Sequence, residues 1–107
     1  MSDYQCIFIV TERGKGDDVV AKAKASGAYG GTIVSGRGSS IHEKRKLLHM
    51  MIKPEKDVVI IVVKKTIVEK IKTVIRESFD LDKVGKGILF VIDVEDVVGV
   101  DIPLKGA

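Results

Sequence analysis

The sequence predicts an α+β fold of the ferredoxin-like class, in which a four-stranded antiparallel sheet is backed by two helices. Four short runs of branched apolar residues and two helical stretches follow one another in the order βαββαβ, and polar or glycine-rich segments separate them. The 107 residues, 45% hydrophobic and 31% charged, are enough to bury one core of this kind. We therefore expect residues 1–107 to form a single domain.

The first strand is expected at residues 4–11, which are rich in isoleucine, valine and phenylalanine. Cys6 lies in this run and is the only cysteine of the chain. Because no histidine stands near it in sequence to stabilise a thiolate, we expect Cys6 to be a small buried hydrophobe rather than a reactive thiol.

A helix and a second strand follow. Asp17 and Asp18 favour a helix N-terminus, and the near-helical apolar spacing behind them stops at Gly27. Residues 32–34 then predict a short strand, which residues 35–36 end. A mobile or irregular stretch is expected after it.

The second half of the chain repeats this pattern. Residues 58–63 form an unbroken apolar run, typical of a central strand whose two faces are covered by helices or neighbouring subunits. Thr66 and Glu69 have the spacing of a capping box at the start of a helix. Residues 80–87 predict a polar loop and residues 88–94 the last strand. The apolar stripe of the helix consists of Ile67, Ile71, Val74, Ile75 and Phe79.

Self-association is expected from this architecture. Two helices can cover only one face of the sheet, yet the strands are apolar on both faces. An open apolar face on so small a protein marks an interaction surface, and a closed ring of copies would bury it.

The positive charge is concentrated in one segment. The formal net charge is +3, and residues 37–56 hold six cations and two anions. Such a segment can meet phosphates. We nevertheless expect no nucleic-acid partner, because the aromatic side chains that a ferredoxin-like RNA-binding sheet uses for base stacking are missing from the strand centres.

Two glycine-containing segments are candidates for an anion site. Residues 36–40, GRGSS, offer flexible amides, hydroxyls and an arginine, which suit an oxyanion, although the Walker spacing is absent and a solvated turn is an equal alternative. Residues 85–87, GKG, form a second glycine turn with a cation. In an oligomer, the loops beside strands two and four can converge on one cleft between subunits.

The sequence contains no recognisable set of catalytic residues. No serine, histidine and aspartate arrangement and no suitable carboxylate pair is visible, so we expect no enzyme. His42 and His49 are expected to be solvated loop residues, and a metal or pH role stays open only if an oligomer brings their copies together. The first residues, MSDYQC, lack the basic region of a signal peptide, which favours the cytoplasm.

The order of these segments resembles the P-II nitrogen regulatory protein family over about residues 4–100. The resemblance rests on GGTIVSGRG at residues 30–38, PEKDVVIIVV at residues 54–63 and VGKGILFVIDVEDV at residues 84–97. No single motif is highly specific. Their order and spacing on one βαββαβ chain carry the resemblance.

The resemblance implies a cytoplasmic homotrimeric signalling protein that binds adenine nucleotides such as ATP, ADP or AMP in clefts between subunits. A long loop, here residues 39–52, would dock onto a regulated protein such as a transporter or a metabolic enzyme, plausibly in nitrogen metabolism. The loop residues expected to bind that partner are His42, Lys44, Arg45 and Lys46. The residues expected to bind the nucleotide or anion are Gly36, Arg37, Gly38, Ser39, Lys56, Gly85, Lys86 and Gly87.

Three departures from the family pattern bear on the ligand. The family's G-D-G-K ends in a phosphate-binding lysine, where this chain has Ile88, so Lys86 can replace it only by turning inward. The arginine-containing segment after the last strand is absent at residues 98–103, and the loop has no modifiable tyrosine. ADP, AMP, another nucleotide or a simple anion therefore remain open as ligands.

Two other classes remain as alternatives. A trimeric metal-associated protein similar to the CutA type shares the fold, but this chain lacks tryptophan and an H-P-Y-like segment. A small acylphosphatase would need a phosphate-binding loop with an arginine at the end of strand one. Arg13 stands there, without the expected loop pattern.

Overall fold

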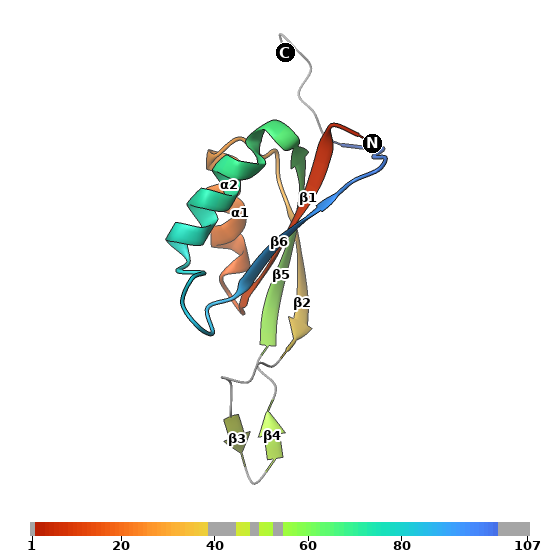
Figure 1. Cartoon of the computed structure of the whole chain (residues 1–107). Helices are drawn as coiled ribbons and strands as arrows, with labels where there is room; N and C mark the ends of the chain where they lie inside the picture. The colour runs from red at the N-terminus through yellow and green to blue at the C-terminus, as the bar shows by residue number, and fades with distance from the viewer. Residues whose placement is uncertain (1, 39–44, 48–49, 53–54, 101–107) are drawn as a thin grey trace.

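In the computed structural model, residues 2–38, 45–47, 50–52 and 55–100 are described. Two helices lie together against one face of a four-stranded sheet, as the sequence predicts (Figure 1). The elements of this layer pair are β1 (Tyr4–Glu12), α1 (Gly16–Ala25), β2 (Thr32–Arg37), β5 (Glu55–Lys64), α2 (Lys65–Ser78) and β6 (Ile88–Asp93). Neither helix in the described ranges has the length and apolarity needed to cross a membrane.

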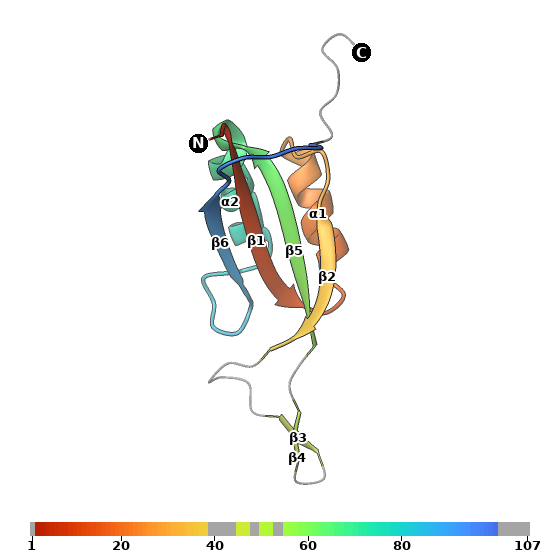
Figure 2. The same cartoon turned by 90° about the vertical axis from the view of Figure 1, so that its right-hand side faces the viewer.

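The sheet is antiparallel and has the order β2-β5-β1-β6. Its two central strands pair over their whole length, from Tyr4 opposite Lys64 to Glu12 opposite Lys56. The strands β2 and β6 are therefore the two edges of the sheet (Figure 2). After β6 the chain crosses the end of the sheet towards the β2 edge.

The core lies between the helices and the sheet. Alternate residues of β1 and β5 point towards the helices, and the side chains that they meet on α1 and α2 are aliphatic. Burial of each such side chain stabilises the fold by about 1.5–3 kcal/mol. The fully buried members are Ile7, Ile9, Val19, Ala23, Val59, Ile61, Ile71 and Ile75.

The second helix was predicted correctly, but its start was not. The N-cap is Lys64, no side chain caps the helix, and Thr66 lies inside it. Strand β5 runs into α2 without a loop, and the Lys65 N–H donates to the Asp3 carbonyl at 2.9 Å. The backbone beside strand β1 thus satisfies one of the four N–H groups that a helix start leaves without intrahelical partners.

The second strand is longer than predicted. Beyond Val34, it continues through Ser35, Gly36 and Arg37, which pair with the first residues of β5. The following stretch was expected to be irregular, but β3 (Arg45–Leu47) and β4 (Met50–Ile52) pair with each other in a small second sheet. The rest of the 39–52 loop lies outside the described residues.

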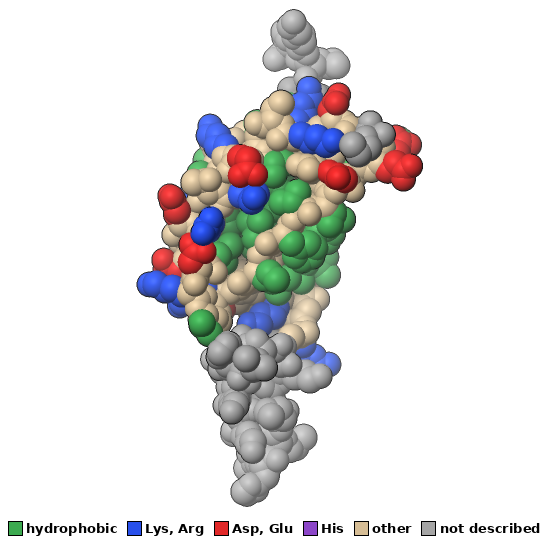
Figure 3. Space-filling model, viewed as in Figure 1, with side chains coloured by type: hydrophobic (Ala, Val, Ile, Leu, Met, Phe, Trp, Pro, Cys, Tyr) green, Lys and Arg blue, Asp and Glu red, His purple; other side chains and the backbone are tan. Residues whose placement is uncertain are grey.

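The face of the sheet opposite the helices is open and apolar, as the sequence predicts. Its exposed members lie on both edge strands: Val34 on β2, and Ile88, Phe90 and Ile92 on β6. Figure 3 shows hydrophobic side chains gathered over the sheet. In a single chain, the run 58–63 is therefore covered on one face only, and burial of its other face would require another molecule.

One expectation about this open face was wrong. Phe8 and Phe90 stand at the centres of β1 and β6, paired in register, so aromatic side chains do occupy strand centres. Their rings stack on each other with centroids 5.1 Å apart and planes 2° from parallel. Each of the two rings thus already stacks on the other. The absence of a nucleic-acid partner stays a prediction.

Cys6 is buried, as predicted, with 5% of its surface exposed. Burial raises the pKa of its thiol, and a hydrogen bond with the Ile61 backbone opposes this in part. We expect a thiol reagent at pH 8 to modify Cys6 at least about tenfold more slowly in the folded protein than in urea, because both access and the thiolate fraction are reduced. Absorbance on reaction with an aromatic disulfide would measure this, and equal rates in the two states would contradict it.

Candidate functional site

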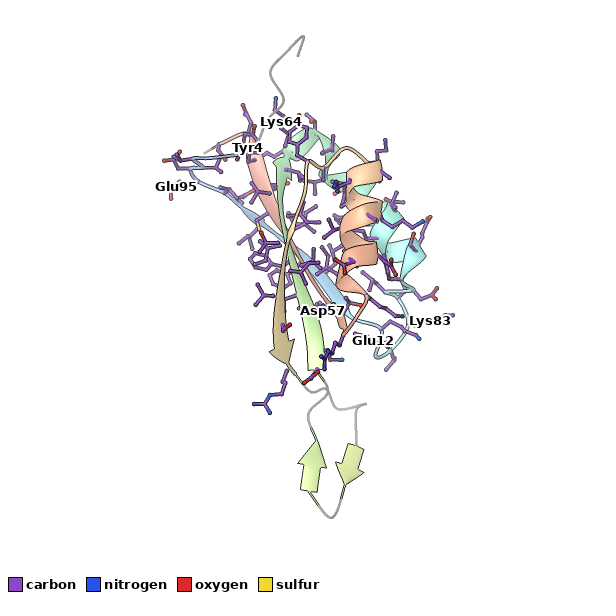
Figure 4. All side chains as sticks on the ribbon, turned by 180° about the vertical axis from the view of Figure 1, so that it is seen from behind. Tyr4, Glu12, Asp57, Lys64, Lys83 and Glu95 are labelled. Atoms are coloured by element: carbon purple, nitrogen blue, oxygen red, sulfur yellow. The ribbon has the colours of Figure 1, made fainter. Side chains whose placement is uncertain are left out.

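The turn between β1 and α1 is fixed by a buried carboxylate. Asp57 on β5 is 8% exposed, and its Oδ2 accepts hydrogen bonds from the N–H groups of Gly14 at 3.0 Å and Gly16 at 2.9 Å. Figure 4 shows Asp57 beside the start of α1, near Glu12. A Cβ at Gly16 would lie 2.8 Å from the same oxygen, so this close approach requires glycine. The bonds hold the turn against the beginning of β5.

This arrangement argues against the acylphosphatase alternative. A phosphate loop would need the amides of the turn after strand one to point at a bound anion. Here the Gly14 and Gly16 amides are taken by Asp57, and the Lys15 N–H donates to the Glu12 carbonyl at 3.1 Å. The turn therefore serves to position residues and does not offer these donors to a ligand.

Beside this turn lies a cavity of about 280 Å³, which we call the cationic cavity. It is lined by Arg13, Ser35, Gly36, Arg37, Glu55 and Lys56. Three of the predicted ligand residues thus lie together, because β2 and β5 pair Gly36 with Lys56 and Arg37 with Glu55. Its three cations and one carboxylate leave a formal charge of +2, which suits an anion.

The structure corrects the prediction that this site is a glycine turn. Gly36 and Arg37 belong to a strand, so their backbone groups follow the sheet and do not form a flexible cradle. Gly38 follows the strand and lies near Lys56, since a Cβ there would be 3.7 Å from the Lys56 Cγ. Ser39 lies outside the described residues. An anion in this cavity would therefore meet side chains more than backbone amides.

The sequence prediction missed three of the six residues that line the cationic cavity, namely Arg13, Ser35 and Glu55. Arg13 and Glu55 are 42 residues apart and form an ion pair, with 72% and 52% of their side chains exposed. The signal that could have found them is the antiparallel register, which places Glu12 opposite Lys56 and so brings the end of β1 to the beginning of β5.

The second predicted segment, Gly85 to Gly87, lies elsewhere in the chain. It precedes β6 at the opposite edge of the sheet, and strands β1 and β5 lie between it and Arg37 on β2. Both glycines have positive φ, and a Cβ at Gly87 would lie 2.5 Å from the Val10 carbonyl oxygen, which requires glycine there. Lys86 does not line the cationic cavity of its own chain.

A second cavity on the β2 edge was not predicted. This cavity, of about 350 Å³, lies at the beginning of β2, whereas the cationic cavity lies at its end. It is lined by Tyr29, Gly30, Gly31, Thr32, Ile60, Val62 and residues 97–100. The segment after β6, which lacks the family's arginines, thus contributes valines to an apolar wall.

The predicted partner-binding residues are described only in part. His42 and Lys44 lie outside the described residues, as does His49. Arg45 and Lys46 belong to β3, whose backbone pairs with β4. Among the described residues, no group of three or more histidine, cysteine or carboxylate side chains could hold a metal.

A comparison with protein families identifies the chain. The pattern of the family described as Nitrogen regulatory protein P-II matches residues 4–101, which include both cavities, the second glycine turn and the whole sheet. A search of curated proteins gave no match to the sequence. Proteins of the matched family are small signalling or regulatory proteins that oligomerise and act on partner proteins. The chain belongs to the P-II nitrogen regulatory protein family.

Proposed function

We propose that this protein is a homotrimeric regulator that binds an adenine nucleotide or a related anion between its subunits and acts on a partner protein. The observation that carries the ligand proposal is the cationic cavity, in which Arg37 and Lys56 lie together at one edge of the sheet. Family membership supports the regulatory role.

The shape of the β2 edge favours a nucleotide over a small inorganic anion. Along β2, the nearest lining residues of the two cavities are Thr32 and Ser35, which are three residues or about 10 Å apart. A ligand with a planar, weakly polar ring at one end and phosphate groups at the other would contact both cavities. Both are open at the surface of the single chain, so a neighbouring subunit could complete them.

The position of the second glycine turn supports a site between subunits. In a cyclic trimer, one edge of each copy faces the opposite edge of the next. The turn Gly85–Lys86–Gly87 of one copy could then approach the cationic cavity of its neighbour. Burial of the open apolar face would stabilise this ring.

The partner is proposed to meet the 39–52 loop. The loop carries His42, Lys44, Arg45 and Lys46 and so favours an acidic surface, such as one on a transporter or a metabolic enzyme. A ligand in the cationic cavity would lie next to the strand ends from which this loop leaves and to which it returns, at Arg37 and Glu55.

Replacement of Arg37 by glutamine tests the ligand site. We expect Arg37→Gln to weaken binding of ATP, ADP or AMP at least about tenfold, because a charge-assisted contact to phosphate is lost. Isothermal titration calorimetry with each nucleotide would measure the effect, with Lys22→Gln on the exposed face of α1 as the control for charge. If no nucleotide binds the wild type, or if Arg37→Gln binds like it, the proposal fails.

A further inference from the structure

The single carboxylate of the cationic cavity has an unusual position. Glu55 is the first residue of β5, stands opposite Arg37 in the sheet register and forms an ion pair with Arg13. A negatively charged side chain thus holds one of the two arginines of a cavity that otherwise suits an anion. An anionic ligand entering this cavity would compete with Glu55 for the Arg13 guanidinium group.

We propose that Glu55 is an internal counter-ion, which occupies Arg13 in the ligand-free chain and is displaced by a phosphate group of the ligand. The inference rests on the proposed anion site and adds two residues to it. Arg13 becomes a binding residue, and Glu55 sets how strongly charged a ligand must be. The Arg13–Glu55 pair is largely exposed, and exposed ion pairs are weak. Replacement of Glu55 by a phosphate group at Arg13 therefore costs little free energy.

The backbone supports this role for Arg13. Its neighbour Gly14 donates to the Asp57 carboxylate, which holds the turn beside the cavity. The Arg13 side chain itself is 72% exposed, so it can turn from one anionic partner to another while its Cα stays in place. Asp57 is therefore a positioning residue, and Arg13 makes the contact.

The same geometry predicts the class of ligand. A single carboxylate brings no more charge than Glu55, which competes from within the chain at a high effective concentration. A phosphate group carries up to two charges and three acceptor oxygens, and the arginine fork binds it in a bidentate manner. The cavity should therefore prefer phosphate-bearing ligands over monocarboxylates, and removal of Glu55 should reduce that preference.

A double-mutant cycle with inorganic pyrophosphate as the probe tests the inference. We expect Arg13→Gln to weaken pyrophosphate binding about tenfold and Glu55→Gln to strengthen it several-fold. In a chain that already carries Arg13→Gln, the increase in affinity caused by Glu55→Gln should be smaller. Lys15→Gln is the matched control, because Lys15 lies in the same turn and does not line the cavity. Thermal unfolding of each variant would verify folding, and calorimetry at constant ionic strength would give the dissociation constants.

The outcomes separate the two proposals. If binding depends on Arg37 and Lys56 but is unchanged in Arg13→Gln, the counter-ion inference is wrong and the anion site stands. The inference is also overturned if Glu55→Gln raises the affinity for pyrophosphate equally with and without Arg13. Glu55 would then act only by repelling the ligand electrostatically, and not by occupying Arg13. If neither the wild type nor Glu55→Gln binds pyrophosphate, both the inference and the anion site fail.

Discussion

Replacing Phe90 by aspartate is expected to dissociate the assembled protein into single chains. Phe90 is 44% exposed in the single chain and lies on the open apolar face, stacked on Phe8. An assembly that buries this face would have to bury the new carboxylate among apolar side chains, with no cation to pair with it. That burial costs several kcal/mol per copy. Because the face is open in one chain, the subunit itself should remain folded.

Light scattering after gel filtration would measure this change in mass. The wild type should have the mass of three 11.6 kDa chains and the Phe90→Asp variant that of one. Ala21→Asp is the matched control, since Ala21 is also exposed and apolar but lies on α1, on the other side of the sheet. A wild type that is already a single chain, or a Phe90→Asp variant of unchanged mass, would refute self-association through this face.

Replacing Asp57 by alanine is expected to lower the free energy of unfolding by about 3 kcal/mol. The change removes the acceptor of two backbone hydrogen bonds and leaves the Gly14 and Gly16 amides without that partner where the turn meets α1. Hydrogen bonds to a charged group are about twice as strong as neutral ones, and Asp57 is largely shielded from solvent. The loss should also release the turn that carries Arg13.

Urea unfolding followed by circular dichroism would measure the loss. The control is Asp93→Ala, which removes an exposed carboxylate whose Oδ1 accepts one side-chain bond from Gln5 Nε2 at 2.8 Å. That variant should lose less than about 1 kcal/mol. If Asp57→Ala is no less stable than Asp93→Ala, Asp57 does not hold the turn.

Sequence reasoning works best here where the apolar pattern is strong. The runs that became β1, β5 and β6 are short, branched and bounded by polar segments, so both their type and their order were predictable. The stripe of α2 was correct at Ile71 and Ile75, which are fully buried, but it included Val74 and missed Val68, which belongs to the core. From these elements the fold class and its open apolar face follow.

The errors arise where tertiary contacts replace local signals. Thr66 has the spacing of a cap, but the Asp3 carbonyl accepts from the Lys65 N–H and the helix starts earlier. Gly36 looks like a turn residue, yet pairing with Lys56 keeps it in a strand. Local sequence carries no information about the strand register that produces such contacts.

The candidate site was predictable only in part for the same reason. Arg37 and Lys56 were proposed from the family pattern and lie together. Arg13 and Glu55 could not be assigned without knowing that the end of β1 meets the beginning of β5. The separation of Lys86 from Arg37 by two strands was equally hidden, and it is one reason why the proposed cleft is placed between two copies.

Subunit complementation tests the central claim, a ligand cleft shared by neighbouring copies, most directly. Arg37→Gln and Lys86→Gln chains would each be purified, mixed in equal amounts, unfolded and refolded together, and titrated with a nucleotide that binds the wild type. In a closed ring with one site per interface, random mixing gives about a quarter of interfaces with both native residues. We predict that the mixture recovers about that fraction of high-affinity sites, although each parent has lost them. A mixture that binds no better than its parents, or a Lys86→Gln parent that binds like the wild type, would contradict the shared cleft.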